Sequence, residues 1–248
     1  DALIITGANV ADPDLKLAPF YEQLKEVVDW SYENVTSTLC SCLATHAVLE
    51  FKYGQKRKAL GKKHWGVFPH KVIDRTHPLV KGVNTRFDIP HSRFNELTES
   101  QFENAKAVVL AKSPIGVHLA VSPDLLRIVF FQGHPEYDSV SLLKEYKREV
   151  ALYLEKKNSD YPPFPSNYLS LQGCAILQEY RAKLINKTET IKNFPEELLT
   201  KTLDNTWHDS ASAIINNWIG CVYQVTNENI RKPFMETINP NNPLNLEK

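Results

Sequence analysis

Short apolar runs alternate with longer amphipathic stretches over residues 1–157 of the chain. The runs are rich in β-branched and aromatic residues, which predicts strands over 2–5, 35–40, 66–68, 107–110, 117–121 and 128–131. Apolar residues at helical spacing predict helices over 19–34, 43–53 and 139–156. Gly54 closes the second helix, and Asp138 is placed to cap the third. Alternating strands and helices predict a layered α/β sheet.

The first predicted strand, 2–5, begins almost at the first residue. Because a domain seldom starts on a core strand, we expect further strands of this sheet to be absent from the chain, in preceding sequence or on another chain. Without them the sheet has an unpaired edge. We expect either a partner chain or the segment between about residues 170 and 203 to cover that edge.

The pattern changes at Asn158. Residues 161–165 read Tyr-Pro-Pro-Phe-Pro and predict a linker, because proline disrupts regular structure. Residues 173–201 look helical but are poorly patterned, and 207–224 predict a firmer helix. We therefore predict two parts. Residues 1–157 form the α/β catalytic domain, and 158–248 form a linker, an insert and a C-terminal helix that packs on the same domain.

Two polar segments interrupt the alternation. Five of the nine residues in 55–63 are Lys or Arg, which indicates either a solvated loop or a rim that collects anions. Residues 90–93, Pro-His-Ser-Arg, follow the apolar 87–89 and predict a polar turn.

Composition narrows the choice of partners. The chain has 248 residues, with 29 Lys+Arg against 29 Asp+Glu, so bulk charge favours neither nucleic acid nor an anionic membrane as a partner. There is no apolar run of membrane-spanning length and no signal-like start. Four cysteines in a chain of this length do not make a disulfide scaffold, which predicts a reducing, cytoplasmic location.

Two strand ends carry candidate chemistry. Cys42 follows one apolar strand directly and precedes a helix, where the positive end of the helix dipole favours the nucleophilic thiolate. His134 follows another apolar strand, with Glu136 two residues on. Alone, such a cysteine is usually a packing residue and a His-Pro-Glu segment is usually a turn. Since open α/β sheets place their chemistry at strand ends, the three residues together predict an acyl-transfer triad.

Several segments carry a resemblance to a known family. They include Pro90–Arg93, Gly133–Asp138 and, late in the chain, Trp207 and 217–226. On these segments the chain resembles the homoserine O-acyltransferase family (homoserine O-succinyltransferase). The resemblance implies a class I glutamine-amidotransferase-like, flavodoxin-like fold. This is a three-layer sandwich around a mostly parallel sheet, with a helical C-terminal extension. It also implies transfer of an acyl group from acyl-CoA to the hydroxyl of homoserine, a step of methionine biosynthesis.

Family roles carry over to individual residues of this chain. The resemblance makes Cys42 the nucleophile that holds the acyl group as a thioester, His134 the general base and Glu136 the carboxylate that orients it. It also implies three substrate-binding residues: Lys63, Ser92 and Arg148. Acyl-CoA enters as a co-substrate, and we expect no bound cofactor and no metal.

The family sorts its acyl donors at the position of Ala11, where a small residue goes with succinyl and a glutamate with acetyl. Alanine neither fills the space nor repels a second carboxylate, so succinyl-CoA is the expected donor. Near the nucleophile the chain departs from the family, with Asn9 for Pro, Leu43 for Trp and His46 for Gln. His46 lies one turn beyond Cys42 and is either a second polar group of the site or a buried structural histidine.

Three functions stay open at this point. The first is the acyltransferase, with small-molecule substrates and a homodimer as the state the family suggests. The second is a cysteine hydrolase or amidotransferase that uses the same triad on another substrate. The third is a non-catalytic homologue that needs a partner chain.

Overall fold

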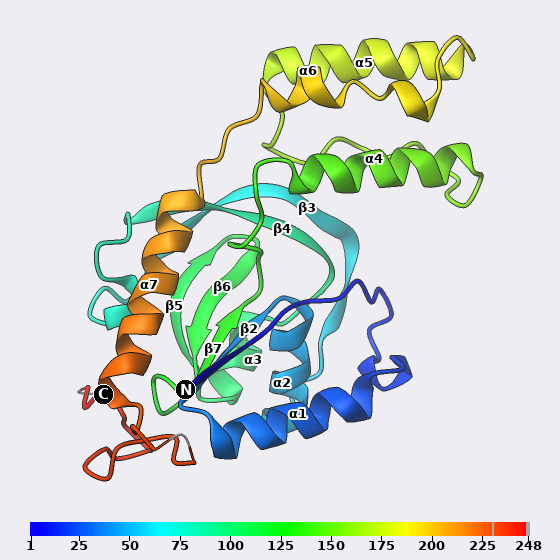
Figure 1. Cartoon of the computed structure of the whole chain (residues 1–248). Helices are drawn as coiled ribbons and strands as arrows, with labels where there is room; N and C mark the ends of the chain where they lie inside the picture. Colours follow the sequence, from blue (N-terminus) through cyan, green and yellow to red (C-terminus); the bar gives the residue numbers. More distant parts are fainter. Residues whose placement is uncertain (230, 247–248) are drawn as a thin grey trace.

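The computed structural model describes residues 1–229 and 231–246. It contains a seven-stranded sheet of order β1-β2-β7-β6-β5-β3-β4 (Figure 1). The strands are β1 (Ala2–Ile5), β2 (Ser37–Ser41), β3 (Lys58–Val72), β4 (Arg86–Glu96), β5 (Val108–Ser113), β6 (Gly116–Val121) and β7 (Ile128–Phe131). The α-helices are α1 (Tyr21–Asn34), α2 (Leu43–Tyr53), α3 (Glu99–Asn104), α4 (Ser141–Leu154), α5 (Leu171–Ile185), α6 (Glu196–Thr200) and α7 (His208–Val225).

The sheet is parallel where it carries the candidate triad. β1 pairs with β2, and β2 with β7, in parallel, whereas the four pairs β7-β6, β6-β5, β5-β3 and β3-β4 are antiparallel. β6 and β3 therefore run opposite to the other five strands. Ser41 pairs with Phe131, so β2 and β7 end at the same edge of the sheet. The predicted α/β fold is confirmed.

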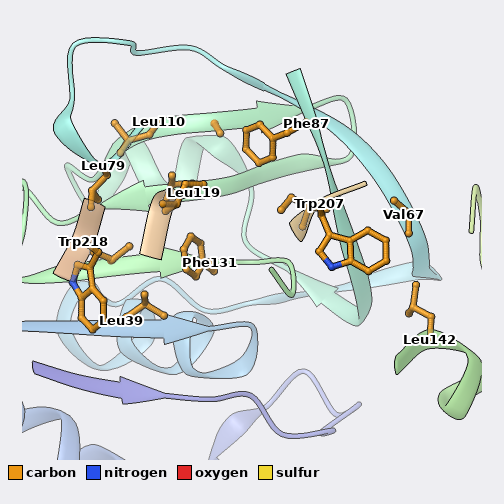
Figure 2. Packing of buried hydrophobic residues seen from close by; sticks show 14 of the residues in the cluster. Leu39, Val67, Leu79, Phe87, Leu110, Leu119, Phe131, Leu142, Trp207 and Trp218 are labelled. Atoms are coloured by element: carbon orange, nitrogen blue, oxygen red, sulfur yellow. The ribbon is translucent and has the colours of Figure 1, made fainter. Parts of the chain in front are cut away.

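Helices cover both faces of the sheet. In one cluster, Cys40 and Phe130 pack with residues of α1, α2 and α3. In the other, Leu39 and Phe131 pack with Trp218 of α7 (Figure 2). Successive residues of a strand point to opposite faces, so adjacent residues of β2 and β7 serve different layers. Cys40 is completely buried and belongs to the core.

The predicted turn at residues 90–93 is wrong, because these residues lie inside β4. The inward positions of β4 begin with the apolar Phe87 and Ile89 and continue with the buried polar residues His91, Arg93 and Asn95, so from residue 91 onward the period of two has no apolar signature. Pro90 is tolerated because β4 is an edge strand of the described sheet. The basic segment 55–63 is likewise not only a loop, since β3 begins at Lys58 and pairs there with Glu96.

The segment after α4 follows a separate course. Residue 166 forms a bridge with Gly66 of β3, where any Cβ would lie 2.2 Å from the Ser166 carbonyl oxygen, so only glycine allows this approach. The helices α5 and α6 then lie beside α4, away from β1 (Figure 1). Lys147 of α4 pairs with Glu196 of α6 at 2.6 Å. The expectation that the insert covers the β1 edge is therefore wrong.

Candidate active site

Cys42 occupies the sharp bend between β2 and α2. Its φ of 50° and ψ of −108° place it in a region that side chains rarely adopt, and such strain is typical of nucleophiles held at strand-to-helix turns. The backbone N–H of Cys42 donates to the Phe131 carbonyl at 2.7 Å, which ties the bend to the end of β7. Gly7 lies against the bend, and a Cβ added there would be 3.1 Å from the Cys42 Cβ.

The loop after β7 supplies His134 and Glu136. Nδ1 of His134 donates to Oε1 of Glu136 at 2.8 Å, and Ser41 Oγ donates to the same oxygen at 3.1 Å. The ring of Tyr137 stacks on the His134 ring with centroids 4.3 Å apart. The backbone N–H of His134 donates to the Pro90 carbonyl at 2.8 Å, so β4 fixes the position of the loop after β7.

Cys42 and His134 line the same cavity, and Cys42 influences the protonation of the imidazole. Burial by itself lowers the pKa of His134, but the charge and hydrogen bond of Cys42, together with Glu136, outweigh burial and raise that pKa to about 10. Burial raises the pKa of Glu136, and its hydrogen bond and ion pair with His134 reverse this and lower it. Cys42 therefore shares a cavity with an imidazole that is hydrogen-bonded to Glu136, and this environment favours the imidazolium.

These side chains open into a cavity of about 160 Å³. Its lining comes from the loop after β1, the start of α2, the residue before β3, β4, the loop after β7 and α4: Gly7, Ala8, Asn9, Val10, Cys42, Leu43, His46, Arg57, Ser92, Arg93, Phe94, Asn95, His134, Tyr137, Glu145 and Arg148. The cavity therefore joins segments that lie more than one hundred residues apart in the sequence.

Glu145 of α4 is a site residue that the sequence interpretation missed. Its carboxylate accepts hydrogen bonds from Ser92 Oγ at 2.6 Å, from the Tyr137 hydroxyl at 2.6 Å and from Trp65 Nε1 at 3.0 Å. Lys63 Nζ lies 3.6 Å from the same carboxylate. Burial raises the pKa of Glu145, but these donors and Lys63 lower it, so the carboxylate stays charged. A glutamate in an amphipathic helix carries no local signal of such a role.

The remaining predicted residues lie at different distances from the nucleophile. Ser92 and Arg148 line the cavity, whereas Lys63 reaches it through Glu145 and packs over the Trp65 ring at 4.3 Å. Ala11 is exposed and lies one residue beyond the lining residue Val10.

His46 fits both interpretations given above, a polar group of the site and a buried structural histidine, because it lines the cavity and is also almost fully buried. Its Nε2 contacts Gln132 Oε1 at 3.1 Å, and that oxygen also accepts from the Leu97 N–H. Nε2 is therefore the donor. Burial is the main cause that lowers the pKa of His46 to about 3, so the ring is neutral at physiological pH.

No metal site accompanies this geometry in the described ranges 1–229 and 231–246, which contain no suitable group of three or more His, Cys, Asp or Glu. None of the helices described in those ranges has both the length and the apolarity that crossing a membrane requires.

The fold and the cysteine bend together define a class I glutamine-amidotransferase-like protein. Two solved structures share the fold: a glutamine amidotransferase from Thermotoga maritima (TM-score 0.52, 12% identity) and one from Methylobacillus flagellatus (TM-score 0.50, 14% identity). Each comparison covers 88% of this chain and 75% of the other.

Sequence comparison then narrows the class to a family. Residues 1–228 match the homoserine O-succinyltransferase family. The chain is 60% identical to the homoserine O-succinyltransferase of Nitrosococcus oceani over 252 aligned positions, which cover all of this chain and 70% of that protein. It is 59% identical to that of Thioalkalivibrio nitratireducens, covering all of this chain and 71% of the relative. The chain belongs to the homoserine O-succinyltransferase family.

Proposed function

We propose that this protein is a homoserine O-acyltransferase that works through a thioester on Cys42, in methionine biosynthesis. One observation carries the proposal: Cys42 sits at a strained bend and lines the same cavity as His134, which is in turn hydrogen-bonded to Glu136 at 2.8 Å. A nucleophile, a base and an orienting carboxylate in series are what acyl transfer requires. The family and its relatives supply the substrates.

In the first half-reaction His134 takes the thiol proton, and the sulfur of Cys42 attacks the carbonyl carbon of acyl-CoA. The bond between that carbon and the sulfur of CoA breaks, and the imidazolium returns the proton to the departing thiolate. N–H groups in the first turn of α2 have no partner inside the helix. The backbone of Gly7 and Ala8 lines the same cavity as Cys42. These groups stabilise the tetrahedral oxyanion.

In the second half-reaction His134 removes the proton of the homoserine hydroxyl. The oxygen attacks the thioester carbonyl, the bond to Cys42 breaks, and the sulfur recovers the proton from His134. Arg148 is placed on α4 at the cavity wall to bind the amino-acid carboxylate as a fork. Glu145 holds Ser92 and Tyr137 in place for the substrate.

Succinyl-CoA is the donor that the site favours. A glutamate at position 11 would place a negative charge beside the cavity, whereas Ala11 leaves its neighbourhood free for a second carboxylate. The names of the relatives agree with this choice.

Intact-mass measurement tests the proposal. After mixing with succinyl-CoA in the absence of homoserine, the protein is expected to gain one succinyl group, which addition of homoserine removes. Cys42→Ala is expected to abolish the adduct. Cys174→Ala changes a cysteine of α5 that does not line the cavity and is expected to keep it. If no short acyl-CoA gives an adduct, or if Cys42→Ala keeps it, the proposal fails.

A glutamine amidotransferase or hydrolase is the second candidate, favoured by the fold shared with the two solved amidotransferases. It predicts release of ammonia from glutamine by wild-type protein and no dependence on CoA. A glutaminase rate lost in Cys42→Ala, together with no succinyl adduct, would support this candidate over acyl transfer.

A further inference from the structure

Arg57 is a buried cation beside the nucleophile. It stands just before β3, and only 6% of its surface is exposed. Its Nε donates to the Pro13 carbonyl at 3.3 Å, and its Nη2 donates to the carbonyls of Val10, at 3.0 Å, and Asp12. The guanidinium therefore holds the loop that contains Ala11.

No carboxylate in residues 1–229 or 231–246 lies within 4 Å of the Arg57 guanidinium. A guanidinium has five N–H donors, and the three bonds to the loop use those of Nε and Nη2. Nη1 makes no hydrogen bond within the described chain. It is also not fully enclosed by protein atoms, so a ligand can reach it. Burying a charge without an ion partner costs free energy, so binding of an anion would stabilise this cation.

The other buried arginine of the cavity has a hydrogen bond on each of its three nitrogens. Arg93 donates from Nε to His91, from Nη1 to the Asn95 carbonyl and from Nη2 to the Ile115 carbonyl, and its Nη1 lies 3.9 Å from Glu96. Arg148, in contrast, has half of its side chain exposed, on the α4 side of the cavity. Arg57 thus differs from Arg93 in having one nitrogen, Nη1, without a hydrogen bond and no carboxylate within 4 Å, and it differs from Arg148 in being buried.

Cys42 and Arg57 line the same cavity. Burial lowers the pKa of Arg57, and the charge of Cys42 is the largest influence that opposes it, ahead of Glu50 and Asp12. A short dicarboxylic acyl group on the sulfur would carry its negative end into this cavity. The Ala11 loop, held by Arg57 and by Asn95 Nδ2 on the Ala11 carbonyl at 2.9 Å, borders the same space.

We propose that Arg57 is a specificity-determining residue, which binds the free carboxylate of the succinyl group while the group is carried on Cys42. This inference rests on the proposed acyl transfer and names the residue that selects a dicarboxylic donor. The absence of a glutamate at position 11 and the attraction by Arg57 then act on the same carboxylate, because Arg57 holds the loop that contains Ala11.

The ratio of kcat/KM for succinyl-CoA to that for butyryl-CoA tests the inference, because butyryl has a methyl group where succinyl has the carboxylate. Wild type is expected to favour succinyl-CoA. Arg57→Gln is expected to lower the ratio by roughly 10-fold to 100-fold, the usual effect of deleting a charged hydrogen bond. Lys58→Gln removes the same charge from an exposed neighbouring position and is expected to leave the ratio unchanged.

Each outcome decides a different question. If wild type transfers acyl groups from neither donor, the proposed function itself fails. If Arg57→Gln slows both donors equally, Arg57 only supports the loop, and the inference is overturned. It is also overturned if wild type does not prefer succinyl-CoA, or if the variant raises KM for homoserine alone.

The ratio is measured within one preparation, so partial unfolding of a variant cancels out. Arg57→Lys keeps the charge but loses the planar fork, and it is expected to give an intermediate ratio. This variant decides the question if Arg57→Gln does not fold. A wild-type ratio in Arg57→Lys would then overturn the inference.

Discussion

The backbone of Cys42 is held in its strained conformation by its neighbours, and Gly7 is one of them. A methyl group at position 7 would lie 3.1 Å from the Cys42 Cβ, tighter than ordinary packing, so the bend must shift by a few tenths of an ångström. Gly7→Ala is therefore expected to lower kcat by about 10-fold or more, since misplacing a reacting group is costly. The thermal midpoint should change little.

Activity and the alkylation rate of Cys42 measure this effect. Gly61→Ala is the matched control, because a Cβ at Gly61 meets nothing within 4 Å in the described part of the chain. Equal rates in the two variants would contradict the expected role of Gly7.

The three candidate triad residues could be proposed from the sequence alone because they follow apolar runs at strand ends, which a linear sequence shows directly. Arg57 and Glu145 were not predictable as site residues. Arg57 is one of five cations in a short segment, and only the fold shows that it turns inward to the 10–13 loop. Glu145 gains its importance from β3, β4 and the loop after β7, which are distant in sequence.

Strands β3, β4 and β6 bring three buried histidines together. The ring centroid of His70 lies 5.1 Å from that of His91 and 5.3 Å from that of His118. Neither nitrogen of His118 has a partner in the described chain. Burial is the main cause that lowers the pKa of His70 to about 4 and the pKa values of the other two well below the usual range. All three rings are neutral in the folded protein.

This cluster predicts loss of stability in mild acid. Below about pH 6.5 these histidines are protonated in the unfolded chain but stay neutral in the folded protein. The free energy of unfolding therefore falls as the pH drops from about 6.5 toward 4. Each such histidine contributes up to about 1.4 kcal/mol per pH unit. His118→Leu is expected to reduce this slope, as measured by urea unfolding from pH 7 to pH 4.5. His208→Gln, at an exposed position, should leave it unchanged, and an unaltered slope in His118→Leu would contradict the account.

The same strands show why the elements were only partly predictable. The helices 43–53 and 207–224 were found close to their observed bounds because their apolar spacing is strong. β4 was missed because its inward positions from residue 91 onward are polar, and the hydrogen bonds that stabilise them, such as the bond from Arg93 to the Ile115 carbonyl, form only in the folded protein. Periodicity in hydrophobicity cannot report a strand whose buried face is charged.

At the scale of the whole molecule, the C-terminal helix α7 is attached to the loop after β7, which carries the candidate residues His134 and Glu136. Trp207, just before α7, is almost fully buried, and its Nε1 donates to the Tyr137 carbonyl at 2.6 Å (Figure 2 shows the ring in the core). Farther along α7, Trp218 Nε1 donates to Ser37 Oγ at 2.8 Å, at the start of the strand that leads to Cys42. The last part of the chain therefore supports both halves of the triad.

This connection predicts that Trp207→Phe couples stability to catalysis. The variant keeps an aromatic ring but leaves the Tyr137 carbonyl without its donor, which should lower the free energy of unfolding by about 2 kcal/mol. Because Tyr137 stacks on His134 and donates to Glu145, kcat should fall as well, while the succinyl-to-butyryl ratio set by Arg57 stays at its wild-type value. Urea unfolding and steady-state kinetics on the same preparation measure both effects. Tyr223→Phe, at an exposed position of α7, is the control and should change neither. A Trp207→Phe protein that loses stability but keeps the wild-type kcat would show that α7 supports the core without reaching the catalytic loop.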